Sequence, residues 1–352
     1  MKLYNYNLLF FLISSVLFFQ CKSGKQNPSV ETPTAEKEYL HFLTKSEAEF
    51  QINQDATDGF FESISIADMS IQLKKSEMPE SGGESKLLYQ EMLKSEMENF
   101  TEVEKDFMHA VFDSAEYALN LINPKLMPKR IELIKTKINH YGPNVYYTRE
   151  DAIILPDNIF TNPSLEAQMP VMLHEIFHIL SRYNVEFREK MYKLIGFVPY
   201  EEDLVLPQEI SKKLLTNPDG VSRRYAINLV DQSGKEQLAL PLILSTKERY
   251  ESSMPSFFSY LAFDLFPLVQ ISESEVTLGL NSKGESALSI EHNANFFEQI
   301  KDNTQYIIHP DEIMADNFMM AVIAHKNKSY EGFSEEGKKL LMEVIEILKT
   351  IE

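Results

Sequence analysis

The chain has 352 residues, a formal net charge of −19 and 43% hydrophobic residues. That apolar content is enough for a buried core and excludes a wholly disordered chain. A single cysteine excludes an internal disulfide and a cysteine-rich metal site. The acidic balance argues against a nucleic-acid binder, because contacts to phosphates need local positive charge.

The N-terminal residues are typical of an exported protein. Residues 8–19 (LLFFLISSVLFF) are uncharged and apolar, too short for a membrane-spanning helix of about 20 residues but typical of a secretory signal core. Cys21 follows, and then a polar stretch. This order resembles a bacterial lipoprotein signal, in which the cysteine is lipidated. The resemblance implies a signal peptide at 1–20, lipidation of Cys21, a tether at 21–38 and a location in the cell envelope; without lipidation the protein would be secreted.

Two regions are expected between the tether and residue 196. Residues 39–126 are predicted to be helical, with a break at Gly82–Gly83, because apolar residues recur at helical spacing. Residues 127–196 begin with short β-branched runs, which predict a small antiparallel sheet. Asn162, Pro163 and Ser164 are expected to open a helical region, in which Pro170 can start or kink the helix that follows. The segment 171–182 lacks proline and glycine, so a continuous helix is allowed there.

Two further regions complete the chain. Residues 197–308 are predicted to be a β-rich insertion with hairpins around 231–234 and 281–284. The apolar run 257–271 between them fits either buried strands or a helix. Residues 309–352 are predicted to form two helices, the second capped by Ser334. The expected fold class is α+β.

The strongest motif is LHEIFHIL at residues 173–180. On a helix, His174 and His178 project from one face one turn apart, so both imidazoles can bind one metal ion. Glu175 is offset by one residue, which suits the general base for a water activated by that metal. The alternative is a pair of core histidines that form hydrogen bonds with nearby carboxylates.

A catalytic zinc site normally has a third protein ligand. Pro310 can begin a helix on which Glu312 and Asp316 lie one turn apart. HExxH followed by ExxxD, with Ala315 before the aspartate, resembles the two motifs of the gluzincin metallopeptidases. The resemblance covers only these two helices. It implies a zincin-like core, Glu312 as the third zinc ligand, and Asp316 as the hydrogen-bond partner that orients His174 or His178.

Several roles stay open. The alternative for Glu312 and Asp316 is an acidic first turn stabilised by the helix dipole, and the alternative third ligands are Glu209 and His292. Zincin peptidases also bind the substrate backbone along an edge strand, for which residues 147–155 are the candidate by analogy. Three residues that follow the motif helix in the sequence are candidates for stabilising the oxyanion: His309, His292 and Tyr306.

These observations predict an exported, membrane-anchored zinc metallopeptidase with one Zn²⁺ and a peptide or protein substrate. Two alternatives remain. The first is a surface zinc-binding lipoprotein that acts as a non-catalytic binding module. The second is a helical scaffold in which the HExxH motif is a coincidence.

Overall fold

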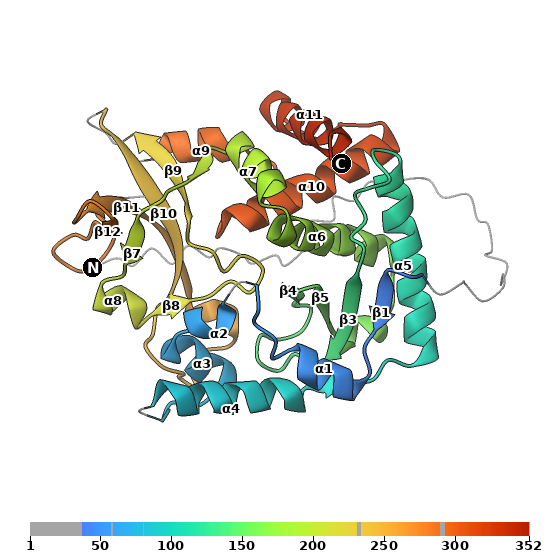
Figure 1. Cartoon of the computed structure of the whole chain (residues 1–352), viewed down its shortest axis with the longest axis horizontal. Coiled ribbons are helices and arrows are strands. Elements are labelled where there is room, and N and C mark those ends of the chain that lie inside the picture. Colours follow the sequence, from blue (N-terminus) through green and yellow to red (C-terminus); the bar gives the residue numbers. More distant parts are fainter. Residues whose placement is uncertain (1–36, 58, 80, 231–233, 289–292, 352) are drawn as a thin grey trace.

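A computed structural model describes residues 37–57, 59–79, 81–230, 234–288 and 293–351. The expected signal peptide and Cys21 lie outside these residues. The described chain has an α+β fold, in which helices surround one sheet and a second sheet forms a separate lobe (Figure 1). Among the described residues, no helix has the length and apolar character needed to span a membrane.

The N-terminal region is mainly helical, as predicted. Its elements after the first short strand are α1 (Lys45–Gln51), α2 (Phe60–Ser63), α3 (Ile66–Leu73), α4 (Gly82–Ser95) and α5 (Glu102–Asn120). Gly82 and Gly83 form the first turn of α4, so the predicted break is the start of a helix. The start of α5 is fixed by a capping box, in which Thr101 accepts from the Glu104 backbone and the Glu104 carboxylate accepts from the Thr101 backbone.

The first sheet is mixed, and the prediction of an antiparallel sheet is wrong in part. Its strands, in the order β1-β3-β5-β4 with β2 beside β3, are β1 (Leu40–Phe42), β2 (Met97–Glu98), β3 (Ile131–Thr136), β4 (Tyr147–Arg149) and β5 (Ala152–Pro156). Strand β3 is parallel to both β1 and β5, while β4 is antiparallel to β5.

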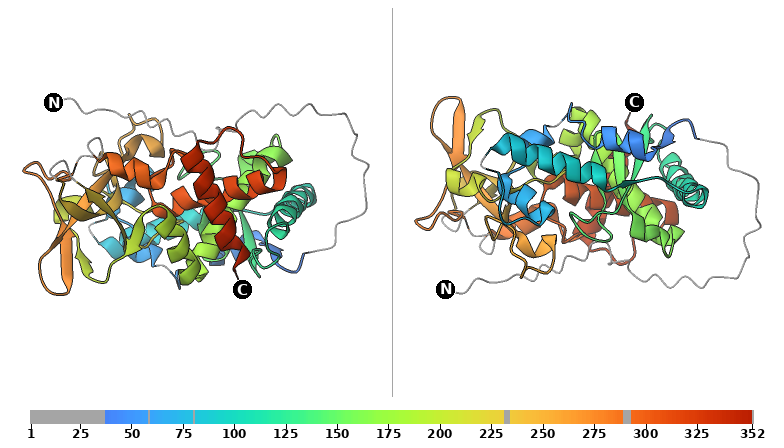
Figure 2. Two further views of the ribbon diagram at one scale, coloured as in Figure 1. Left: turned by 90° about the horizontal axis from the view of Figure 1, so that it is seen from above. Right: turned by 90° about the horizontal axis from the view of Figure 1, so that it is seen from below.

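Burial of the sheet on both faces accounts for the parallel pairing. Leu133 and Ile153 pack into the core beneath α5 and α6, whereas Ile134 and Ile154 pack into a second core with α1 and α4. Strands that are apolar on both faces are typical of covered parallel sheets. In the view from below, α1 and α4 lie on the near side of the molecule (Figure 2).

The motif helix lies in the centre of the molecule. Helix α6 (Leu165–Tyr183) begins after Ser164, whose hydroxyl accepts from the backbone of the first turn, and it continues through Pro170. It packs between α5 and α10 (Pro310–Asn327). Helix α7 (Val185–Leu194) packs on α6 and α10, and α11 (Glu335–Lys349) packs on α10 and α7. Ser334 caps α11, as predicted.

The second sheet forms the lobe at the left of Figure 1. Its strands, in the order β6-β9-β10-β11-β12-β7 with β8 beside β10, are β6 (Phe197–Pro199), β7 (Asp203–Val205), β8 (Leu214–Leu215), β9 (Tyr225–Val230), β10 (Glu236–Ser245), β11 (Leu261–Gln270) and β12 (Glu275–Leu278). The short helices of this part of the chain are α8 (Gln208–Ser211) and α9 (Ala294–Ile300).

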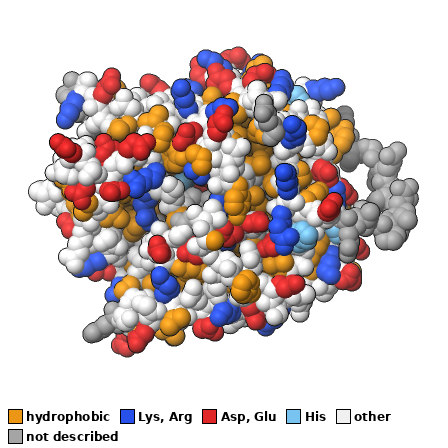
Figure 3. All heavy atoms as spheres, viewed as in Figure 1, with side chains coloured by type: hydrophobic (Ala, Val, Ile, Leu, Met, Phe, Trp, Pro, Cys, Tyr) orange, Lys and Arg blue, Asp and Glu red, His pale blue; other side chains and the backbone are white. Residues whose placement is uncertain are grey.

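The lobe agrees with only some of the predicted hairpins. Strands β9 and β10 form the first predicted hairpin. At the second predicted hairpin, the described residues contain one bridge, Leu280–Ser286. The apolar run 257–271 consists of a 3-10 turn, Phe257–Tyr260, followed by β11. Acidic and basic side chains are intermingled over the face shown in Figure 3.

Candidate metal centre

Helices α6 and α10 bring three predicted ligands together. His174 Nε2 lies 3.1 Å from Glu312 Oε2, and His178 Nε2 lies 3.6 Å from the same oxygen. All three side chains are buried. The spacing of the two histidines places both on the face of α6 that meets α10. The motif pair, although distant in the sequence, therefore forms one cluster that could hold a metal ion.

A separate aspartate orients each histidine. His174 Nδ1 lies 2.9 Å from Asp316 Oδ1, so Asp316 takes the histidine partner that the resemblance implied. His178 Nδ1 lies 2.6 Å from Asp311 Oδ2, and Tyr192 donates to the other oxygen of Asp311. In each pair Nδ1–H donates to a carboxylate, which leaves the Nε2 lone pair available to a metal.

The donor set fits a small divalent cation with tetrahedral geometry. Two ligand atoms bonded at 2.0–2.1 Å to a tetrahedral ion lie roughly 3.3–3.4 Å apart, and the two separations from Glu312 Oε2 bracket this value. His178 Nε2 is buried and has no hydrogen-bond partner among the described residues. An unsatisfied buried nitrogen is costly unless another group, such as a metal ion, binds it.

A second possible ligand group overlaps the first. Glu175, His178 and Asp219 also bring ligand atoms within 4.8 Å of one another. Because Asp311 holds Nδ1 of His178, both groups need the single lone pair on Nε2. They are therefore alternatives for one ion rather than sites for two.

Carboxylates make the metal-free histidines basic. Burial disfavours an imidazolium, but the hydrogen bonds to Asp316 and Glu312 outweigh it and raise the pKa of His174 well above its ordinary value. For His178, burial is likewise outweighed by Asp219, Glu312 and Asp311, and its pKa is raised to about 9. Metal binding must therefore displace protons from this site.

The surroundings of Glu175 disfavour its charged form, whereas those of the two histidines favour theirs. Burial, reinforced by the charge of Asp219, raises the pKa of Glu175 to about 8, although the two histidines oppose the shift. One oxygen of Glu175, Oε2, is buried, and no described residue forms a hydrogen bond with it. Burial also raises the pKa of Asp219 to about 6. A carboxyl whose pKa lies near neutrality can exchange protons with a substrate.

A loop of the β-rich lobe completes the cluster. Asn217 donates from Nδ2 to Glu312 Oε1 at 2.7 Å, and Asp219 accepts from the hydroxyl of Thr148 at 2.9 Å. Arg182, one turn beyond His178, donates to the backbone oxygens of Pro218 and Asp219 and so ties the loop to α6. The loop between β8 and β9 is thus held at the site from two sides.

The loop needs a glycine where it approaches α10. A Cβ at Gly220 would lie 2.3 Å from the ring of His309, so any other residue here would force that ring to move. His309 caps α10, with its Nδ1 accepting from the Asp311 backbone at 3.1 Å. It is therefore a structural cap that also contacts the loop.

The other predicted residues lie in different places. The Tyr306 ring stacks near that of His174, with centroids 6.3 Å apart. Burial and then the charges of Glu312 and Asp219 raise the pKa of Tyr306 well above its ordinary value, so its hydroxyl stays protonated. Glu209 is exposed on α8 and outside the cluster, and His292 lies outside the described residues.

The candidate edge strand is partly covered. Strand β4 is the edge of the first sheet, but its residues are buried. The backbone N–H of Thr148 already donates to Asp219. The backbone oxygen of Thr148 also accepts from Arg182 at 3.5 Å, so both backbone groups of this residue are bonded within the chain.

Sequence reasoning missed three residues of the site: Asn217, Asp219 and Asp311. Asp311 could have been found from its place beside Glu312 in a first helical turn. The run Asn-Pro-Asp-Gly at 217–220 indicates a turn, but nothing in it indicates burial against a distant helix. In the comparisons with known proteins, no family model, curated protein or solved structure matches the chain.

Proposed function

We propose that the protein is an exported, lipid-anchored zinc metallopeptidase with a zincin-like core. The observation that carries the proposal is the convergence of His174, His178 and Glu312 with the buried, unpartnered carboxylate oxygen of Glu175 beside them. Two imidazoles and one carboxylate are the ligand set of many catalytic zinc sites. A bound zinc ion would polarise a peptide carbonyl and acidify water.

In this proposal the chain's own residues position and transfer protons. Glu175 acts as the general base, because its raised pKa lets it accept a proton near neutral pH and return it to the leaving amine. Asp316 and Asp311 hold the histidines with Nε2 toward the metal position. Tyr306, whose ring lies near that of His174 and whose hydroxyl stays protonated, is the candidate donor to the developing oxyanion. The lipid anchor at Cys21 would hold this site at a membrane surface.

The test is cleavage of an unbiased peptide library by the zinc-loaded protein. We expect the wild type to cleave peptides and Glu175→Gln to retain the metal but lose about 100-fold or more of the rate. Glu166→Gln is the matched control, because Glu166 is exposed in the first turn of the same helix; it should cleave like the wild type.

Two results would contradict parts of this proposal. Zinc retention without cleavage by the wild type would favour a non-catalytic zinc-binding lipoprotein. Full cleavage by a zinc-loaded Glu175→Gln protein would refute the role of Glu175 while leaving the metal site intact.

A further inference from the structure

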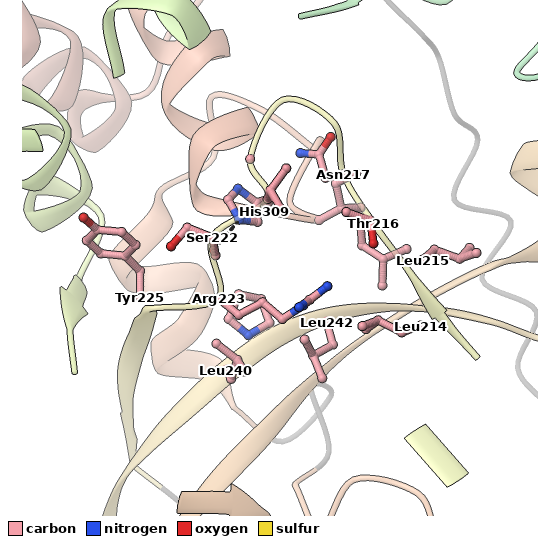
Figure 4. Close-up of a pocket in the computed structure, with 15 residues that line it drawn as sticks. Leu214, Leu215, Thr216, Asn217, Ser222, Arg223, Tyr225, Leu240, Leu242 and His309 are labelled. Carbon is pink, nitrogen blue, oxygen red and sulfur yellow. Dashed lines mark hydrogen bonds between the residues drawn. The ribbon is translucent and has the colours of Figure 1, made fainter. Parts of the chain in front are cut away.

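A narrow pocket lies beside the candidate metal centre, between the loop after β8 and strand β10 (Figure 4). Much of its lining is apolar and includes Leu214, Leu240, Leu242 and Ile308. Arg223 is the one arginine or lysine that lines it, and its side chain extends across the pocket toward the leucines. A cation is therefore held against an apolar wall.

The guanidinium of Arg223 has no counter-charge among the described residues. Its terminal nitrogen Nη2 is buried and makes no hydrogen bond within the described part of the chain. The neighbouring Arg224 is exposed and pairs with Asp203 at 2.9 Å, and the buried Arg182 donates to several backbone oxygens. Of these three arginines, Arg223 is the half-buried one, and among the described residues its buried Nη2 lacks a hydrogen bond.

Such an arrangement is costly in the free protein. Burial lowers the pKa of Arg223 from its ordinary value, with only Tyr200 acting in the opposite direction. An arginine still remains charged in a protein. A buried guanidinium is stabilised most strongly by a carboxylate, which can accept two parallel hydrogen bonds from it.

The pocket shares a wall with the metal centre. Asn217 lines the pocket and donates to Glu312, a proposed metal ligand. His309 lines the pocket and caps the helix that carries Glu312. The pocket that contains Arg223 and the metal centre are therefore connected through Asn217 and His309.

We propose that Arg223 binds a carboxylate of the peptide substrate, so that the enzyme selects an acidic side chain or a free C-terminus at one fixed distance from the cleaved bond. This inference rests on the proposed function. The narrowness of the pocket suits a small planar group rather than an aromatic side chain. Removing one charge-assisted hydrogen bond of this kind costs about 10- to 100-fold in selectivity.

The deciding experiment measures which peptides are cleaved. Two libraries of equal composition, one with free C-termini and one amidated, are digested by the wild type, Arg223→Met and the matched control Arg224→Met. We expect the wild type and Arg224→Met to favour acidic residues at one position, or free C-termini, by about tenfold or more. Arg223→Met should lose that preference, and Arg223→Glu should favour lysine or arginine there.

The two libraries distinguish the two sources of the carboxylate. A preference that survives amidation identifies an acidic side chain, and a preference that disappears on amidation identifies the chain end. Cleavage by the wild type without either preference, or with a preference that Arg223→Met retains, would overturn the assignment while leaving the proposed peptidase function in place.

A second measurement applies if the wild type cleaves nothing. The melting temperatures of wild type, Arg223→Met and Arg224→Met are compared in glutarate and in its uncharged diamide at equal ionic strength. A ligand that binds only the folded state raises the melting temperature. We expect glutarate to stabilise the wild type and Arg224→Met but not Arg223→Met. That result would support the anion site and refute only the peptidase function. An equal change of melting temperature in all three proteins would refute the anion site.

Discussion

Two buried clusters of histidine and carboxylate lie in different cores of the molecule. In the His140 cluster, Glu96 contacts Nδ1 of His140 and the Tyr147 hydroxyl lies 3.2 Å from its Nε2. In the cluster of the candidate metal centre, His178 has a carboxylate at Nδ1, but its Nε2 makes no hydrogen bond among the described residues. Both histidines are buried. The difference between them is one unsatisfied nitrogen that faces other ligand atoms.

The number of ring nitrogens that have a partner distinguishes a structural histidine from a metal ligand. A buried imidazole with partners on both nitrogens is complete and contributes to folding alone. A buried imidazole with one free nitrogen, 3.6 Å from a glutamate oxygen that also approaches a second histidine, requires a further partner. Variants in the two clusters should therefore change different properties.

The largest difference is expected for metal affinity. Asp311→Asn removes the carboxylate that holds the His178 tautomer, and it should weaken zinc binding about 10- to 100-fold. Glu96→Gln makes the same kind of change in the His140 cluster and should leave zinc affinity unchanged. Competition with a fluorescent chelator measures both. Equal affinities in the two variants would show that Asp311 has no part in metal binding.

A smaller effect is expected for the stability of the His140 cluster. Glu96→Gln weakens a buried hydrogen bond, so it should lower the free energy of unfolding by about 1–3 kcal/mol. Urea denaturation of the apo protein measures this change. An unchanged unfolding midpoint would mean that the Glu96–His140 contact contributes nothing to folding.

The smallest effect is expected for the pH dependence of the reaction. Glu175 must be ionised to accept a proton, so activity falls as the pH drops below its pKa. Asp219 raises that pKa, so Asp219→Asn should move the acid limb of the pH–rate profile to lower pH, by less than about one unit.

Asp203→Asn is the control for this profile, because Asp203 is exposed and pairs with Arg224 in the β-rich lobe. Its acid limb should match that of the wild type. A shift of the Asp219→Asn profile to higher pH would show that Asp219 does not act on Glu175 through its charge.

The features that could be predicted are those that depend on residues close together in the sequence, such as helix faces and helix caps. The one-turn spacing of His174 and His178 places them on one face of any helix, and the helical termini at Ser164 and Ser334 follow from their hydroxyl caps. Glu312 was found only through a motif resemblance, since no local rule connects residues on different helices.

The parts that could not be predicted depend on contacts between distant segments. Whether β3 runs parallel to β5 is decided by the path of the chain between them, not by the alternation within each strand. Asn217 and Asp219 lie in a turn-like sequence, and only the packing of the lobe against α6 and α10 brings them to the cluster. For Arg223, likewise, only the three-dimensional structure reveals a buried guanidinium nitrogen that no described residue contacts by a hydrogen bond.

The most direct test of the account is the metal content of the purified protein after loading with zinc and removal of excess ion. We predict one zinc per chain in the wild type and in Glu96→Gln, in which the altered glutamate pairs with a buried histidine away from the centre. We predict a loss of most of the zinc in Glu312→Gln, in which an amide replaces the oxygen shared by His174 and His178. A wild type without zinc, or a Glu312→Gln protein that retains one zinc per chain, would contradict the proposed metal centre.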